Sequence, residues 1–144
     1  MTLEELDQKF PNGLVDAEIT GLAVDYSQRS ATLQMNVRCS PPDSLDRGVY
    51  TPAVLTAREV FYLSIEPPDL DHLSSFQAST ITVDGFPEDP EKFPLFAHLK
   101  SKHLMGAFCC RFYVHDWNSF IHLAAGSAEF SRVESRAQTP GGSF

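Results

Sequence analysis

The stretch AFCCRFYVHDWNSFIHLAAGSAEFSRV, residues 107–133, predicts a long β-hairpin that turns at Trp117 and Asn118. Side chains of a strand point alternately to opposite faces, and apolar residues occupy every second position on both arms. Asn118 suits the turn because asparagine tolerates a positive φ, and Gly126 predicts a bulge or a close contact on the second arm. If Asp116 pairs with Ser119, the apolar pairs on one face are Val114 with Ile121, Phe112 with Leu123, and Cys110 with Ala125.

The candidate binding residues lie on the opposite face of this hairpin and at its tip. They combine a guanidinium, aromatic rings, imidazoles and a carboxylate, and they are Arg111, Tyr113, His115, Asp116, Trp117 and His122. In the predicted register Tyr113 is directly opposite His122, close enough for the two rings to interact. A mixed polar and aromatic face is also typical of the half-covered outer side of an antiparallel sheet, so both interpretations stay open.

The rest of the chain predicts four more strands and two short helices. The expected strands are residues 16–26, 30–39, 54–65 and 76–83, and the expected helices are residues 3–9 and 94–103. A change of hydrophobic phase at Gly21 predicts a bulge in the first strand. A helix competes with the strand interpretation around residues 54–65, and residues 84–94 are rich in turn-forming types. The sequence therefore predicts an α+β, mainly β domain, an antiparallel sheet of about six strands in hairpins with one or two short helices.

The length and the net charge of the chain limit the kinds of function that it can have. The 144 residues fit a single domain over residues 1–134, followed by a disordered tail at residues 135–144. The formal net charge of −8 argues against nucleic-acid binding and against adhesion to an anionic membrane, whereas it favours a basic protein partner. The start MTLEELDQKF does not resemble a signal peptide, and no apolar run reaches the roughly 18 residues of a membrane span. With three cysteines and no CxxC pattern, the expected location is the cytoplasm.

Catalytic and metal chemistry find little support in the residue pattern. In the predicted register Cys109 faces Gly126, two pairs away from His122, which is too far for a shared metal ion with His115. We therefore expect no metal site and no cofactor. The one nucleophilic set that can be drawn is Cys109 with His122 or His115 and Asp116, and buried free cysteines are the commoner case.

Residues 14–25, LVDAEITGLAVD, resemble the opening strand of a loose group of small bacterial domains of unknown or immunity-type function. In that group the first strand begins with a His-Asp-Ala-x-Ile-like pattern and has a later Asp before the hairpin turn. In this chain Val15 occupies the position of the His. The resemblance covers the first half of the chain. It implies a small β-rich domain with no known catalytic residues, and some members of the group are thought to neutralise a toxin by binding it.

Three functions remain as expectations. The first is a non-catalytic, immunity-type bacterial module that binds a protein through its acidic surface or the mixed face of the hairpin. The alternative is a small-molecule-binding or hydrolase-like domain with a pocket between the curved sheet and the helix at residues 94–103. The third is a homodimer in which the partner is a second copy of the chain.

Overall fold

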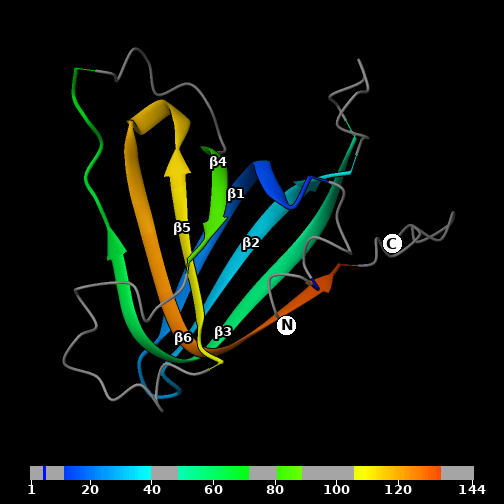
Figure 1. The fold of residues 1–144 in the computed structure, drawn as a ribbon, viewed down its shortest axis with the longest axis vertical. Helices are drawn as coiled ribbons and strands as arrows, with labels where there is room; N and C mark the ends of the chain where they lie inside the picture. Colours follow the sequence, from blue (N-terminus) through cyan, green and yellow to red (C-terminus); the bar gives the residue numbers. More distant parts are fainter. Residues whose placement is uncertain (1–4, 6–11, 40–48, 72–80, 89–105, 134–144) are drawn as a thin grey trace, which may run out of the picture.

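The six strands in the described part of the chain form one closed antiparallel barrel. The computed structural model describes residues 5, 12–39, 49–71, 81–88 and 106–133. Within these residues the elements are six strands and a short turn of 3-10 helix: β1 (Leu14–Asp25), β2 (Ser30–Arg38), β3 (Tyr50–Ile65), β4 (Ile81–Pro87), β5 (Phe108–Val114), η3 (His115–Trp117) and β6 (Ser119–Arg132). Their order is β1-β2-β3-β6-β5-β4, and the pairing of β4 with β1 closes the sheet (Figure 1).

The α+β class predicted from the sequence is wrong. Strands account for 74% of the described residues, and within that part of the chain only Glu5 and η3 are helical. Apart from Glu5, the helices predicted at residues 3–9 and 94–103 lie outside the described residues, as does the tail at 135–144. A sheet has to cover its apolar face, and the predicted α+β class requires helices that pack on that face. The barrel instead covers this face by closing the sheet on itself.

The inner faces of the strands form a single core. The strand predicted at residues 30–39 is confirmed as β2, in which the alternate residues Ala31, Leu33, Met35 and Val37 are all buried. The largest fully buried side chains come from β2, β3, β4, β5 and β6, and they are Phe112, Leu33, Met35, Leu55, Leu123, Val37, Val83, Val114 and Cys110. Side chains therefore fill the interior, as is usual for barrels of few strands.

Several local expectations are confirmed and one is wrong. The β1–β2 register shifts between Ile19 and Gly21, where a bulge was predicted, and the predicted strand at residues 54–65 lies within β3. However, β4 continues through Asp84 and Gly85 to Pro87, although the sequence there had indicated a turn. Neighbouring strands on both sides supply the pairing that keeps this glycine- and proline-containing segment extended.

The long strands β3 and β6 bend together at one end of the barrel, the lower end in Figure 1. Glu59 of β3 has a φ of 56°, and a Cβ on Gly126 of β6 would lie 3.1 Å from the Cβ of Glu59. The close contact predicted at Gly126 is therefore confirmed. Absence of a side chain at Gly126 lets the two strands stay paired through the bend.

The β5–β6 hairpin has the predicted faces but a different register. Phe112 pairs with Ile121, Arg111 with His122 and Tyr113 with Phe120, which is a slip of two residues from the predicted pairing. The cause is the tip, where η3 and Asn118 form a longer connection than the predicted two-residue turn. A slip of two keeps every side chain on its face, since strand side chains alternate with period 2. The positive φ expected at Asn118 is confirmed at 46°.

Candidate functional site

The outer surface of β3, β6, β5 and β4 carries a continuous series of aromatic side chains. We call it the aromatic face and define it by Tyr62, Phe86, Arg111, Tyr113, Phe120 and His122. Each of these side chains is half-buried except that of Phe86, which is exposed. Because four adjacent strands contribute, the face is a property of the barrel wall and not of one loop.

Ring contacts run across this face from β3 to the hairpin tip. The centroid of Tyr62 lies 6.5 Å from that of His122, and His122 lies 5.9 Å from Phe120. Phe120 is 5.3 Å from Tyr113, which in turn is 5.7 Å from His115 of η3. These separations and tilted orientations are those of interacting aromatic pairs, so the rings hold one another in place.

Arg111 lies across the centre of the aromatic face. Its guanidinium carbon is 4.8 Å from the ring centroid of Phe120 and 6.0 Å from that of Phe86, which are cation–π distances. Its Nε lies 3.1 Å from Oε1 of Glu88. The contacts on both sides fix a planar cation on the surface of the barrel.

Carboxylates surround the aromatic face among the described residues. Glu66 lies beyond the end of β3, where its Oε2 accepts a hydrogen bond from the backbone N–H of Phe120 at 3.0 Å. Its other oxygen is 3.6 Å from Nε2 of His122. The acidic residues beside this face and at the hairpin tip are Glu66, Asp69, Asp84, Glu88 and Asp116.

The hairpin tip is held by a short chain of hydrogen bonds. The hydroxyl of Tyr113 donates to Oδ1 of Asn118 at 2.8 Å, and Nδ2 of Asn118 donates to Oδ2 of Asp69 at 3.3 Å. The N–H of Asp69 donates to the carbonyl oxygen of Trp117 at 2.8 Å. These bonds join the segment after β3 to the tip of the β5–β6 hairpin.

The structure separates the predicted site residues into three groups. Arg111, Tyr113 and His122 lie together on the aromatic face, and the predicted pair Tyr113–His122 is replaced by Tyr113–Phe120 and Arg111–His122. Asp116 is exposed on η3, whereas Trp117 packs against the core. His115 lies at the end of the ring series and turns toward β4.

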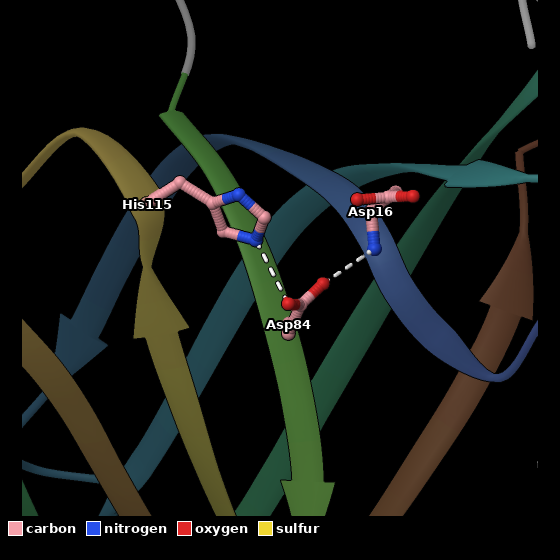
Figure 2. A group of neighbouring side chains, drawn as sticks. All are labelled: Asp16, Asp84 and His115. Atoms are coloured by element: carbon pink, nitrogen blue, oxygen red, sulfur yellow. Dashed lines mark hydrogen bonds and ion pairs between the residues drawn. The ribbon is translucent and has the colours of Figure 1, made fainter. Parts of the chain in front are cut away.

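His115 belongs to a second cluster, formed with Asp84 of β4 and Asp16 of β1 (Figure 2). Its Nε2 is 2.9 Å from Oδ2 of Asp84, and Oδ1 of Asp84 accepts a hydrogen bond from the backbone N–H of Asp16 at 2.8 Å. The remaining contact comes from Arg38 of β2, whose Nη1 lies 3.3 Å from Oδ2 of Asp16. Four elements of the barrel therefore meet through polar side chains at this end.

Backbone geometry explains how Asp16 reaches this position. Its φ is 55°, in the left-handed region, and the β1–β4 register shifts between Leu14 and Ala17. The irregularity turns the N–H of Asp16 toward a side-chain carboxylate. Asp84 was not among the predicted site residues, because the sequence DGFP at residues 84–87 is typical of a turn. The alternation of Ile81, Val83 and Gly85 with Asp84 and Phe86 is the pattern that could have shown the longer strand.

The three cysteines are free, and two of them are buried. Cys109 lies opposite Ala124, not opposite Gly126 as predicted, and clusters with Ala124, Phe61 and Tyr62. Burial raises the pKa of the Cys110 thiol far above its ordinary value, with smaller contributions from Cys109 and Glu88. Such apolar settings are typical of structural cysteines, so Cys109 and Cys110 do not support a nucleophilic role.

A cavity of about 290 Å³ lies at another part of the barrel wall, beside the β1–β2 turn. Its lining includes Tyr26, Arg29, Phe61 and Tyr62. None of Tyr113, His115 and His122 lines it, so it is not the pocket that the enzyme alternative requires. Tyr62 is the residue that this cavity shares with the aromatic face.

Comparisons with known proteins add little to this description. No protein-family model matches the chain. No curated protein matches it in sequence. Among solved structures, an uncharacterized protein from Neisseria gonorrhoeae is similar, with 10% sequence identity, a TM-score of 0.39, and coverage of 83% of this chain and 93% of that one. In the described part of the chain no helix has the length and apolar character needed to cross a membrane.

Proposed function

We propose that this protein is a non-catalytic binding module that holds a basic protein partner on its aromatic face. The observation that carries the proposal is the series of rings around Arg111, bordered by carboxylates. Tyrosine and arginine are enriched among the residues that dominate protein–protein affinity, because they bury large areas with few rotatable bonds. An immunity-type role in a bacterium, as the resemblance of residues 14–25 implies, is part of this proposal, and so is the cytoplasmic location expected from the cysteine pattern.

The charge around the aromatic face supports a basic partner. Five carboxylates lie beside it and at the hairpin tip, whereas Arg111 is the one permanent cation that defines the face. The whole chain carries a net charge of −8, which steers cationic proteins toward it. A partner with lysines or arginines around an apolar centre would match both the rings and the carboxylates.

The proposal is tested by substituting alanine for the side chains at the centre of the aromatic face. The triple variant Arg111→Ala, Tyr113→Ala and His122→Ala removes two rings and the cation from half-buried outer positions, so the barrel core stays intact. We expect it to fold and to bind the partner roughly 100-fold more weakly, because each side chain contributes at a typical interface centre. The partner is first captured from a lysate and identified by mass spectrometry, and the purified pair is then titrated calorimetrically.

A control pair is available on β3 and β6, away from the centre of the aromatic face. Arg58 of β3 and Glu129 of β6 form an exposed ion pair with Nη2 and Oε2 3.5 Å apart. The double variant Arg58→Ala and Glu129→Ala leaves the net charge unchanged, and we expect it to retain wild-type affinity. Equal affinity of the triple variant and the wild type would overturn the proposal. A chain that captures only itself and sediments as a dimer would support the homodimer alternative instead.

A further inference from the structure

We propose that Asp16, Asp84 and His115 form a binding site for a divalent transition-metal ion, with Zn²⁺ as the test case. One side-chain atom from each residue lies within 4.8 Å of the other two (Figure 2). The three come from β1, β4 and η3, which only the closed barrel brings together. This site lies at the His115 end of the ring series, beside the proposed partner-binding centre of Arg111, Tyr113 and His122. The metal proposal does not depend on the proposed function.

The donor set suits this class of ion. Two carboxylate oxygens and one imidazole nitrogen are common ligands of Zn²⁺, and a site with three protein ligands leaves a position for water. Tetrahedral ligands about 2.0–2.2 Å from the ion lie roughly 3.3 Å from one another. Nε2 of His115 and Oδ2 of Asp84 are 2.9 Å apart, and every pair of donor atoms in the cluster lies within 4.8 Å, so the side chains have to draw together to hold one ion.

Contacts outside the three ligands hold the two carboxylates in position. Nη1 of Arg38 forms an ion pair with Oδ2 of Asp16, and the backbone N–H of Asp16 donates a hydrogen bond to Oδ1 of Asp84. Ligating carboxylates in metal sites are oriented by outer hydrogen bonds of this kind. Oδ2 of Asp84 then faces Nε2 of His115 at 2.9 Å, and an ion would take the place of that contact.

The buried guanidinium of Arg38 also limits the affinity. With a neutral imidazole, the formal charges of Asp16, Asp84 and Arg38 sum to −1, and the side chain of Arg38 is only 9% exposed. The arginine repels a cation more strongly than an exposed charge would. Dissociation constants in the micromolar range are therefore expected, in place of the far tighter binding of structural zinc sites.

The experiment titrates the chelator-treated full chain with Zn²⁺ alone, by calorimetry and by thermal unfolding. We expect one ion per chain and a rise in melting temperature with ion concentration, because an ion that binds only the folded state stabilises it. Asp84→Asn and His115→Gln should each weaken binding by at least about 10-fold. His115 is exposed at the hairpin tip, so this variant folds even if Asp84→Asn does not.

Two comparisons decide between this site and adventitious binding. Asp25→Asn makes the same charge change as Asp84→Asn at an exposed position by the β1–β2 turn, and it should leave the affinity for Zn²⁺ unchanged. No binding by the wild type, or undiminished binding by His115→Gln, would refute the site. A loss in His122→Gln as large as that in His115→Gln would show an ion held adventitiously by surface histidines, and would refute it too.

Discussion

Two glycines, Gly85 and Gly21, differ in how much space the barrel wall leaves for a side chain. Gly85 of β4 lies opposite Leu14 in the pairing that closes the barrel, and a Cβ at Gly85 would lie 2.7 Å from the Cβ of Leu14. It would also lie 3.1 Å from Cε1 of Phe112 in the core. At Gly21, in contrast, a Cβ would make an ordinary contact of 3.4 Å with the side chain of the exposed Gln34. The two glycines therefore have different roles, although both lie within strands.

The substitution Gly85→Ala should lower the free energy of unfolding by about 1–3 kcal/mol, since the added methyl group overpacks a core contact. Gly21→Ala is the control, and it should change stability by less than about 1 kcal/mol because its Cβ has space. Urea denaturation followed by circular dichroism measures both. Similar stabilities of the two variants would contradict the tight seam between β1 and β4.

At the scale of elements, the β5–β6 hairpin shows which features of a strand pair the alternation of side chains can predict. Period-2 patterning assigned Arg111, Tyr113 and His122 to one face, and the structure confirms it. The register was wrong by two residues, because parity distinguishes odd from even slips but not one even register from another. The tip sets the register, and its geometry depends on η3 and on the positive φ of Asn118.

The tip can be tested with the pair Asn118→Gly and Asn118→Ala. Both variants lose the hydrogen bonds to Tyr113 and Asp69, and they differ only by a Cβ at a φ of 46°. Glycine adopts this conformation without steric cost, so the alanine variant should be less stable by about 1 kcal/mol. Thermal and urea unfolding of the two proteins give the difference. An alanine variant as stable as the glycine variant would argue against a left-handed residue at this tip.

At the scale of the whole molecule, the closed barrel makes the interior one core. Phe112 is fully buried there, whereas Phe86 is 41% exposed on the aromatic face, so the chain offers a matched pair of phenylalanines on adjacent strands. Phe112→Ala should lower the free energy of unfolding by about 3–5 kcal/mol, a large part of the roughly 5–15 kcal/mol of a typical domain. Phe86→Ala should cost less than half as much.

Urea denaturation with fluorescence and circular dichroism as separate probes measures both phenylalanine variants. Coincident curves from the two probes are expected for the wild type, because one shared core unfolds as a unit. If Phe86→Ala were as damaging as Phe112→Ala, the outer face would have to be part of the core. The binding proposal for the aromatic face would then lose its basis.

The sequence alone determined the local features of this protein. Alternation placed the inner faces of β2 and of the β5–β6 hairpin, the phase change marked the bulge at Gly21, and the tolerance of asparagine for a positive φ marked the left-handed residue at Asn118. It also brought Arg111, Tyr113 and His122 onto one face. These features depend on the sterics of neighbouring residues and on pairing within one hairpin, so a short stretch of sequence carries enough information to predict them.

Only the tertiary structure decided the closure of the barrel and the cluster at its end. The sequence pattern of a strand with one apolar face is the same whether a helix covers that face or the sheet closes into a barrel. Alternation therefore could not exclude the α+β class. Closure depends on β4 pairing with β1, two strands that lie far apart in the sequence. The same pairing brings Asp16 to Asp84, 68 positions apart, and neither residue carries a local signal of the other. Long-range pairing is set by the combined twist and bends of all six strands, which no single segment encodes.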